Sequence, residues 1–126
     1  MIVLWIALAG GLGAVARLVL DGVARQRLSS YPVGTLLINL SGSLLLGLVA
    51  GLVAGSVLPE QVRLVAGTGF LGGYTTFSTA SVETVRLLRD GRRTAALLHG
   101  LGMLVGAVAL AGLGWWVGSL VATLGR

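Results

Sequence analysis

The stretch that decides the fold is residues 67–79, which read Gly67-Thr68-Gly69-Phe70-Leu71-Gly72-Gly73-Tyr74-Thr75-Thr76-Phe77-Ser78-Thr79. It lies within a run from Leu64 to Val82 that contains no Asp, Glu, Arg or Lys, so we expect it at membrane depth. Two glycines closely followed by two β-branched threonines make poor helix sequence. The residues alone leave two interpretations open. One is a helix break whose freed carbonyls bind a cation, and the other is a mild glycine kink with no ion bound.

The composition around this stretch is that of a membrane protein. The chain has 126 residues, enough for one domain, of which 56% are hydrophobic and only 10% are charged. An average soluble domain carries about 25% charged residues, so this chain has too little polar surface to cover a soluble protein. The composition therefore excludes a soluble globular domain and a disordered chain. Because the chain has no Cys, it is not a disulfide scaffold either.

Charge-free runs outline four membrane spans. They cover residues 1–16, 28–59, 64–82 and 94–125, and the connections between them are too short to hold a soluble domain. The first run lacks a basic leader, so we expect a retained span rather than a cleaved signal peptide. The prediction is an all-α membrane protein with one domain over residues 1–126, its third helix broken near the middle and its spans at residues 2–20, 33–58, 63–88 and 94–124.

Glycines repeat at the spacing that lets helices pack closely in lipid. The four-residue repeats are Gly47, Gly51 and Gly55, then Gly102 and Gly106, then Gly114 and Gly118. This pattern predicts a tight bundle and carries no information about a substrate.

The predicted spans hold neutral polar residues and no carboxylate in their middle. The four acidic residues fall at or near span ends: Asp21, Glu60, Glu83 and Asp90. A proton-coupled pump or exporter usually needs an acid inside the membrane. The chain also has no Cys nucleophile, and its single His99 has no acid nearby in sequence, so we expect neither an enzyme nor a clustered metal site. Neutral hydrogen-bond donors, by contrast, can replace the water around an ion.

Three stretches resemble the Fluc/CrcB family of fluoride channels. They are Gly10–Arg17, Gly34–Ser43 and Gly69–Thr79, which occur in the family's order and spacing. The segment Gly-x-x-Gly-Gly-x-Thr-Thr-Phe-Ser-Thr is close to unique to that family, whereas the fourth span matches only in length and character. The resemblance implies antiparallel dimers of four-span subunits with two narrow pores along the interface. It also implies a central structural Na⁺ that is not transported, held by backbone carbonyls at the positions of Gly72 and Thr75.

The resemblance assigns a set of pore residues, with two departures. The positions that match fluoride contacts are Asn39, Phe77, Ser78 and Thr79. The positive edge of a phenylalanine ring can face an anion. A second family phenylalanine falls at Ala80, and Met103, which offers an anion no donor, stands with His99 where polar or aromatic pore residues are usual. Arg17 and Glu83 are candidates for a pore mouth or for a structural charge pair.

The arginines predict how the chain sits in the membrane. The net charge of +5 comes from nine arginines and four acids, and we relate it to membrane topology rather than to nucleic acid. Seven arginines follow spans 1 and 3, at positions 17, 25, 27, 86, 89, 92 and 93, and two lie on the other side, at positions 63 and 126. Because arginine-rich loops usually stay in the cytoplasm, this split places both termini outside the cell, on the outer side of the cell membrane. An antiparallel homodimer needs little bias, so the split favours a heterodimer with an oppositely oriented paralogue. A dual-topology homodimer remains the alternative.

The function implied by the resemblance is passive, fluoride-selective efflux from the cytoplasm. Two other classes stay open. A small multidrug-type exporter would need an acid in the first span, where none occurs before Asp21. A non-conducting or half-pore subunit of a heterodimeric channel would fit the departures at Ala80 and Met103.

Overall fold

A computed structural model describes residues 1–27 and 32–125 of the chain. The start of the second charge-free run, at residues 28–31, and Arg126 lie outside the described residues. The described part is almost entirely helical. Its elements are α1 (Ile2–Arg27), α2 (Val33–Ala54), α3 (Glu60–Val62), the π-helix η1 (Arg63–Leu71), α4 (Gly72–Tyr74), α5 (Phe77–Arg89), α6 (Arg93–Leu97), the π-helix η2 (Leu98–Gly102) and α7 (Met103–Leu124).

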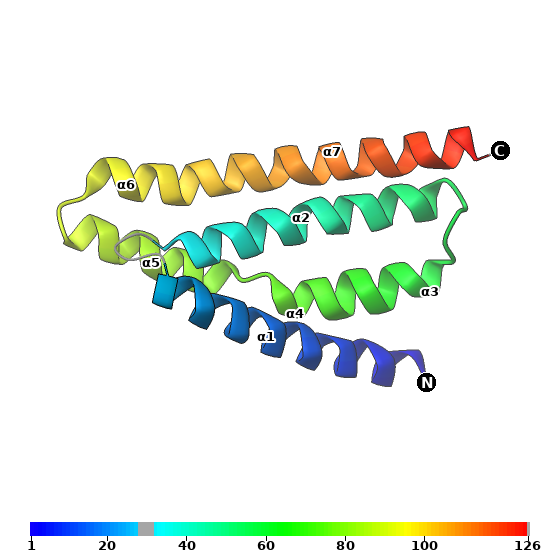
Figure 1. Ribbon diagram of the computed structural model, residues 1–126, viewed down its shortest axis with the longest axis horizontal. Coiled ribbons are helices and arrows are strands. Elements are labelled where there is room, and N and C mark those ends of the chain that lie inside the picture. Colours follow the sequence, from blue (N-terminus) through cyan, green and yellow to red (C-terminus); the bar gives the residue numbers. More distant parts are fainter. Residues whose placement is uncertain (28–31, 126) are drawn as a thin grey trace.

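These helices form one elongated bundle (Figure 1). Helix α2 packs along the length of α7, and α1 packs against η1 and α4. Helices α5 and α6 make the turn at one end of the bundle, and the N-terminus and the last turn of α7 lie together at the other end. Three helical stretches within the described residues are long and apolar enough to cross a membrane: Ile2–Gln26, Val33–Ala54 and Arg93–Leu124.

The first helix continues to Arg27, beyond the predicted span end at residue 20. Residues 21–27 contain no proline, and Arg25 pairs with Asp21 one turn earlier at 2.9 Å, which supports the extra turns. The connection that we expected to start at Asp21 is therefore helical in its first part.

The distribution of polar and apolar side chains suits a lipid environment. Many large apolar side chains face outward, among them Leu12, Val105 and Val108. Trp5, Trp115 and Trp116 are also about half exposed. The buried residues, by contrast, include several polar ones: Thr35, Asn39, Glu83 and His99. Because lipid does not drive apolar side chains together, contacts between small residues and polar groups hold such a bundle.

Glycines bring α2 and α7 into backbone contact. A Cβ atom added at Gly47 would lie 2.0 Å from the Ala111 carbonyl oxygen, and one at Gly51 would lie 2.3 Å from that of Trp115. The contact is equally close from the side of α7, since a Cβ atom added at Gly118 would lie 2.6 Å from the Leu48 carbonyl oxygen. The predicted repeats Gly47/Gly51/Gly55 and Gly114/Gly118 thus lie at this contact. Gly102, in contrast, has no neighbour within 4 Å of an added Cβ.

A second glycine contact joins α1 to the segment before residue 75. An added Cβ at Gly13 would lie 2.0 Å from the Phe70 oxygen, and one at Gly73 would lie 2.1 Å from the Gly10 oxygen. The Gly10–Arg17 stretch therefore forms the surface on which η1 and α4 rest.

The turn between α5 and α6 depends on Gly91. Its φ of +74° places it in the left-handed region that favours glycine. The amide of Arg92 donates to the Leu87 oxygen and that of Gly91 to the Leu88 oxygen, the hydrogen-bond pattern of a Schellman cap. This cap ends α5, and the turn that it forms lets α6 and η2 pack back against α5.

The starts of α3 and η1 carry an exposed pair of opposite charges, Glu60 and Arg63. The Arg63 guanidinium donates to Glu60 Oε1, with the Nε donor at 2.8 Å. This hydrogen bond lowers the pKa of the Glu60 carboxyl below its ordinary value.

The helix contact predicts a sharp difference between two glycines of α7. A Cβ at Gly114 would lie 2.2 Å from the Leu44 oxygen, whereas nothing lies within 4 Å of a Cβ at Gly112. We expect Gly114→Ala to lower the free energy of unfolding by about 1–3 kcal/mol, because overpacking against backbone forces the helices apart. The matched control Gly112→Ala should leave stability unchanged or raise it by up to about 1 kcal/mol. Denaturation in detergent measures both, and equal losses would contradict the contact.

Candidate functional site

The backbone leaves the helical conformation at two threonines. Thr75 has φ −78° and ψ 157°, and Thr76 has φ −148° and ψ 119°, so both are extended. Gly72 and Gly73, which precede these threonines in the stretch of poor helix sequence, are helical and belong to α4. The β-branched threonines favour extended backbone, while Gly73 provides the close contact with α1. The interruption therefore lies after the glycines rather than at them.

Asn39 of α2 makes two hydrogen bonds to the backbone of this interruption. Its Oδ1 accepts from the Thr76 amide at 2.8 Å, and its Nδ2 donates to the Thr76 carbonyl at 2.9 Å. Asn39 is 8% exposed, so the pair is shielded from solvent within the chain. A side-chain amide that carries both a donor and an acceptor is well suited to replace the helical partners that an extended residue loses.

The interruption also removes helical donors from the carbonyl groups just before it. In a continuous helix the amides of residues 76–79 would donate to the carbonyl oxygens of residues 72–75. The Thr76 amide donates instead to Asn39, and the Thr79 amide donates to Thr76 Oγ1 at 3.2 Å. The carbonyls of Gly72 and Thr75 are thus among those that lose their helical donors.

Hydroxyl groups gather at the start of α5. Thr76 is the N-cap residue of this helix, and its Oγ1 lies 3.3 Å from Ser78 Oγ and 3.1 Å from Thr79 Oγ1. The N-terminal end of a helix carries a partial positive charge from its aligned peptide dipoles. An anion placed here would meet hydroxyl donors and a favourable field together.

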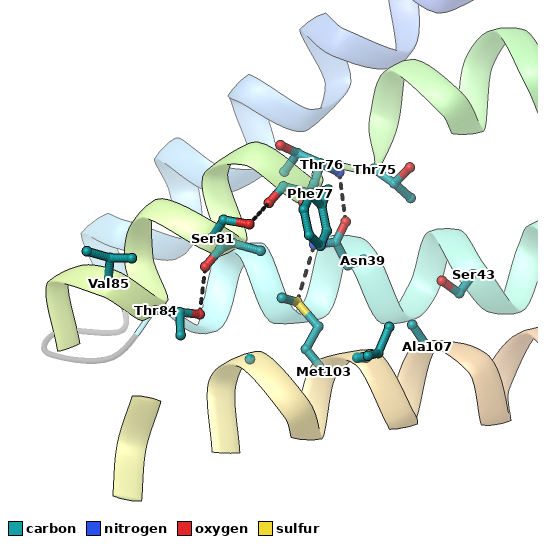
Figure 2. Close-up of a pocket in the computed structure, with 13 residues that line it drawn as sticks. Asn39, Ser43, Thr75, Thr76, Phe77, Ser81, Thr84, Val85, Met103 and Ala107 are labelled. Carbon is teal, nitrogen blue, oxygen red and sulfur yellow. Dashed lines mark hydrogen bonds between the residues drawn. The ribbon is translucent and has the colours of Figure 1, made fainter. Parts of the chain in front are cut away.

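A cavity of about 540 Å³ opens beside the interruption. It lies between α2, α5 and α7, as Figure 2 shows. None of its lining residues is charged: Asn39, Ser43, Thr75, Thr76, Phe77, Ala80, Ser81, Thr84, Val85, Gly100, Met103, Leu104 and Ala107. The hydroxyls of Ser81 and Thr84 donate to helix carbonyls, those of Phe77 and Ala80 respectively.

The cavity includes two of the four predicted pore positions. Asn39 and Phe77 line it, whereas Ser78 and Thr79 are not among its lining residues, although their hydroxyls lie within hydrogen-bond distance of Thr76, which does line it. The Phe77 side chain is 85% exposed and therefore is not a packing residue within this chain. Both departures from the family pattern, Ala80 and Met103, are buried in the cavity wall.

Glu83 and His99 form a buried polar contact at the α5–η2 junction. His99 is fully buried, and its Nε2 lies 3.3 Å from Glu83 Oε2, so the fold supplies the acid that is missing near His99 in the sequence. The other oxygen of Glu83 accepts from Arg25 Nη2 at 3.1 Å. The proposed charge pair therefore needs correction: among the described residues Glu83 pairs with Arg25, and Arg17 is not its partner. The reason is geometric, because α1 extends far enough to bring Arg25 level with α5.

Two residues of the site were not singled out from the sequence. Thr76 was one hydroxyl among several, yet it caps α5 and is held by Asn39. Met103 was noted only as a departure, yet its Sδ accepts from Asn39 Nδ2 at 3.3 Å. The signal for Thr76 was present, since threonine is one of the residues preferred at helix N-caps. No sequence pattern links residue 103 to residue 39.

Comparison with known proteins finds a matching family model and similar named proteins. The model of the family described as "CrcB-like protein, Camphor Resistance (CrcB)" matches residues 4–115. A protein of Leifsonia xyli subsp. xyli named "Fluoride-specific ion channel FluC 1" is 58% identical over 121 residues, which cover 95% of this chain and 88% of that protein. A protein of Cutibacterium acnes named "Fluoride-specific ion channel FluC 2" is 48% identical over 123 residues, covering 96% and 100%. A third, from Syntrophotalea carbinolica, is 44% identical over 116 residues and is also named a fluoride-specific ion channel.

The double contact on Thr76 predicts that Asn39 is needed for stability. Asn39→Leu removes the partners of the Thr76 N–H and C=O groups, so we expect the free energy of unfolding to fall by about 2–4 kcal/mol. Ser43→Ala is the matched control, because Ser43 lines the same cavity from the same helix and no hydrogen bond is recorded for it among the described residues. Denaturation in detergent measures both variants. A loss no larger than that of the control would mean that Asn39 does not hold the interruption.

Proposed function

This chain belongs to the CrcB-like family, and from that membership we propose that it is a fluoride-selective ion channel that lets fluoride leave the cytoplasm passively. The observation that carries the proposal is the uncharged cavity beside the hydroxyl-rich start of α5, within a chain so similar to proteins named as fluoride channels. A dehydrated anion needs donors that replace its water, and neutral donors bind it without holding it permanently.

The fluoride contacts that we propose are Asn39, Phe77, Ser78 and Thr79. Asn39 contributes an amide N–H, the two hydroxyls contribute donors at the positive end of α5, and the edge of the Phe77 ring faces the ion. The absence of charge from the cavity lining favours passive movement of an anion. Weak acid enters the cell as HF and ionises there. A negative interior then drives the anion outward by about 2.3 kcal/mol per 100 mV.

We propose that the carbonyls of Gly72 and Thr75 hold a structural Na⁺ that is not transported. Their helical donors are diverted to Asn39 and to the Thr76 hydroxyl, so both oxygens lack the amides that they would have in a continuous helix. Backbone carbonyls are suitable ligands for Na⁺. When bound, the ion supplies positive charge that compensates carbonyls otherwise costly to bury in lipid. This donor set fits the ion well.

The segment over residues 63–88 is proposed as the third of four membrane spans, broken at Thr75 and Thr76. An even number of crossings places both termini on one side, and the start of α1 and the end of α7 lie at the same end of the bundle (Figure 1). The exposed Phe77 side chain and the open side of the cavity support a second subunit that covers α5, packed antiparallel.

The second subunit is proposed to be an oppositely oriented paralogue, with a dual-topology homodimer as the alternative. The ends of α1 and α5 and the start of α6 bring Arg25, Arg86, Arg89, Arg92 and Arg93 to one end of the bundle, while Arg63 lies near the other. That asymmetry favours one orientation in the cell membrane, with both termini outside. A half-pore or non-conducting role in such a pair is a second candidate, because Met103 uses an Asn39 N–H group.

Liposome flux tests the proposed channel directly. We expect the purified chain, alone or with its paralogue, to release fluoride from loaded liposomes and to leave chloride inside. An ion-selective electrode records both anions, and protein-free liposomes are the control. Flux that requires the paralogue would support the heterodimer. If no combination releases fluoride, the chain is not a channel.

Mapping the termini tests the orientation. With the chain expressed alone, we expect tags at both termini to be accessible from outside the cell, because the arginine-rich end stays in the cytoplasm. A protease or membrane-impermeant label measures accessibility. Arg92→Glu combined with Arg93→Glu should increase the opposite orientation. Equal populations in the unaltered chain would instead indicate a dual-topology homodimer.

A further inference from the structure

The Asn39 amide makes three hydrogen bonds that together use all of its donors. Oδ1 accepts from the Thr76 amide, while Nδ2 donates to the Thr76 carbonyl at 2.9 Å and to Met103 Sδ at 3.3 Å. Figure 2 shows the Met103 side chain directed at this amide. The orientation of the amide is unambiguous, because the Thr76 N–H group requires an oxygen opposite it. Asn39 therefore has no spare N–H group within the described residues to offer an anion.

The two Nδ2 hydrogen bonds differ greatly in strength. A backbone carbonyl is a strong acceptor, whereas a thioether sulfur is a weak one. Releasing the Thr76 carbonyl would also undo the contact that holds the interruption. The N–H group that points at Met103 is therefore the one that an anion can take at small cost.

We propose that the Met103 sulfur is a placeholder acceptor, which fluoride displaces when it binds Asn39 Nδ2 in the cavity. This inference rests on the proposed function, and it names Met103 as a residue that sets the affinity of the channel for fluoride. Met103 is 7% exposed and lines the same cavity as Asn39. Its unbranched side chain has three rotatable bonds, so the sulfur can turn away from the amide.

The small neighbours of Met103 leave room for this exchange. Ala80 and Gly100 line the cavity around it, where larger side chains would restrict the thioether. In the displaced state the Nδ2–H group bonds to an anion, and hydrogen bonds with a charged partner are about twice as strong as neutral ones. The second N–H group of Nδ2 and the oxygen keep their bonds to Thr76 throughout.

Removing the sulfur should therefore raise the affinity for fluoride. In Met103→Leu the volume is nearly conserved, but fluoride no longer competes with an acceptor for the Asn39 N–H group. We expect the half-saturating fluoride concentration to fall about fivefold, which corresponds to about 1 kcal/mol. A residue that served only for packing would leave this concentration unchanged or raise it.

The composition of the chain allows a direct test by NMR. Asn39 is the single Asn of the sequence, and Met1 and Met103 are its two methionines. The full chain, labelled with ¹⁵N-Asn and ¹³C-methyl-Met, is reconstituted in nanodiscs in the assembly that the flux assay identifies, with only this chain labelled. Sodium fluoride is then titrated against sodium chloride at equal ionic strength.

We expect fluoride to shift one Asn39 side-chain proton and the Met103 methyl signal with the same midpoint. The exposed Met1 methyl is the internal control and should not move, and chloride should move neither signal. In Met103→Leu the Asn39 midpoint should fall about fivefold, whereas in Leu104→Met, which alters the same cavity wall, it should not change. If Met103→Leu fails to fold, the coincidence of the two midpoints in the unaltered chain decides the question.

The outcomes separate this inference from the proposed function. An Asn39 signal that ignores fluoride, different midpoints for the two signals, or an unchanged midpoint in Met103→Leu would overturn the role of Met103, even where liposome flux is present. Absence of flux with coincident shifts would instead leave the displacement intact and reject the channel.

Discussion

In the hydrocarbon core of a bilayer a backbone N–H or C=O group has no water to bond, and every such group needs a partner within the protein. This constraint matters most at the extended residues Thr75 and Thr76. The amide of Thr76 and its carbonyl are both bonded by Asn39, and the Thr76 hydroxyl caps the helix that follows. Carbonyls just before the interruption, those of Gly72 and Thr75 among them, lose their helical donors. The site follows from how these few groups are satisfied.

The glycine contacts are what allow this arrangement to be held rigidly. Asn39 reaches Thr76 because α2 lies close to the interruption: a Cβ atom added at Gly42 would lie only 2.4 Å from Thr75 Cγ2. On the opposite side, Gly73 rests on the Gly10 carbonyl. Small residues thus serve two purposes, replacing the hydrophobic driving force that lipid does not provide and bringing one polar side chain within hydrogen-bond distance of the extended segment.

The buried charges lie apart from the cavity. Glu83 is shielded from solvent, but Arg25 and His99 contact its two oxygens, and none of the three residues lines the cavity. Removing one partner of such a group leaves a charge buried without compensation, which is strongly destabilising. Pairing Glu83 within the protein therefore keeps a negative charge from facing an anion pathway, and it ties α1, α5 and η2 together.

The sequence by itself determined the membrane character, the helical class and the family, because composition and the spacing of glycines and threonines do not depend on tertiary contacts. It also indicated Asn39, Phe77, Ser78 and Thr79 through motif resemblance. It marked Gly72 and Gly73 together with the two threonines after them as poor helix sequence, without deciding which of the four residues leaves the helix. Only the tertiary structure decided that Asn39 bonds to Thr76 and that Met103 accepts from the remaining N–H group of Asn39. It also decided that Arg25 rather than Arg17 neutralises Glu83. Each of these contacts joins residues more than 30 positions apart, and hydrogen bonds between separate helices depend on helix register, which no local pattern encodes.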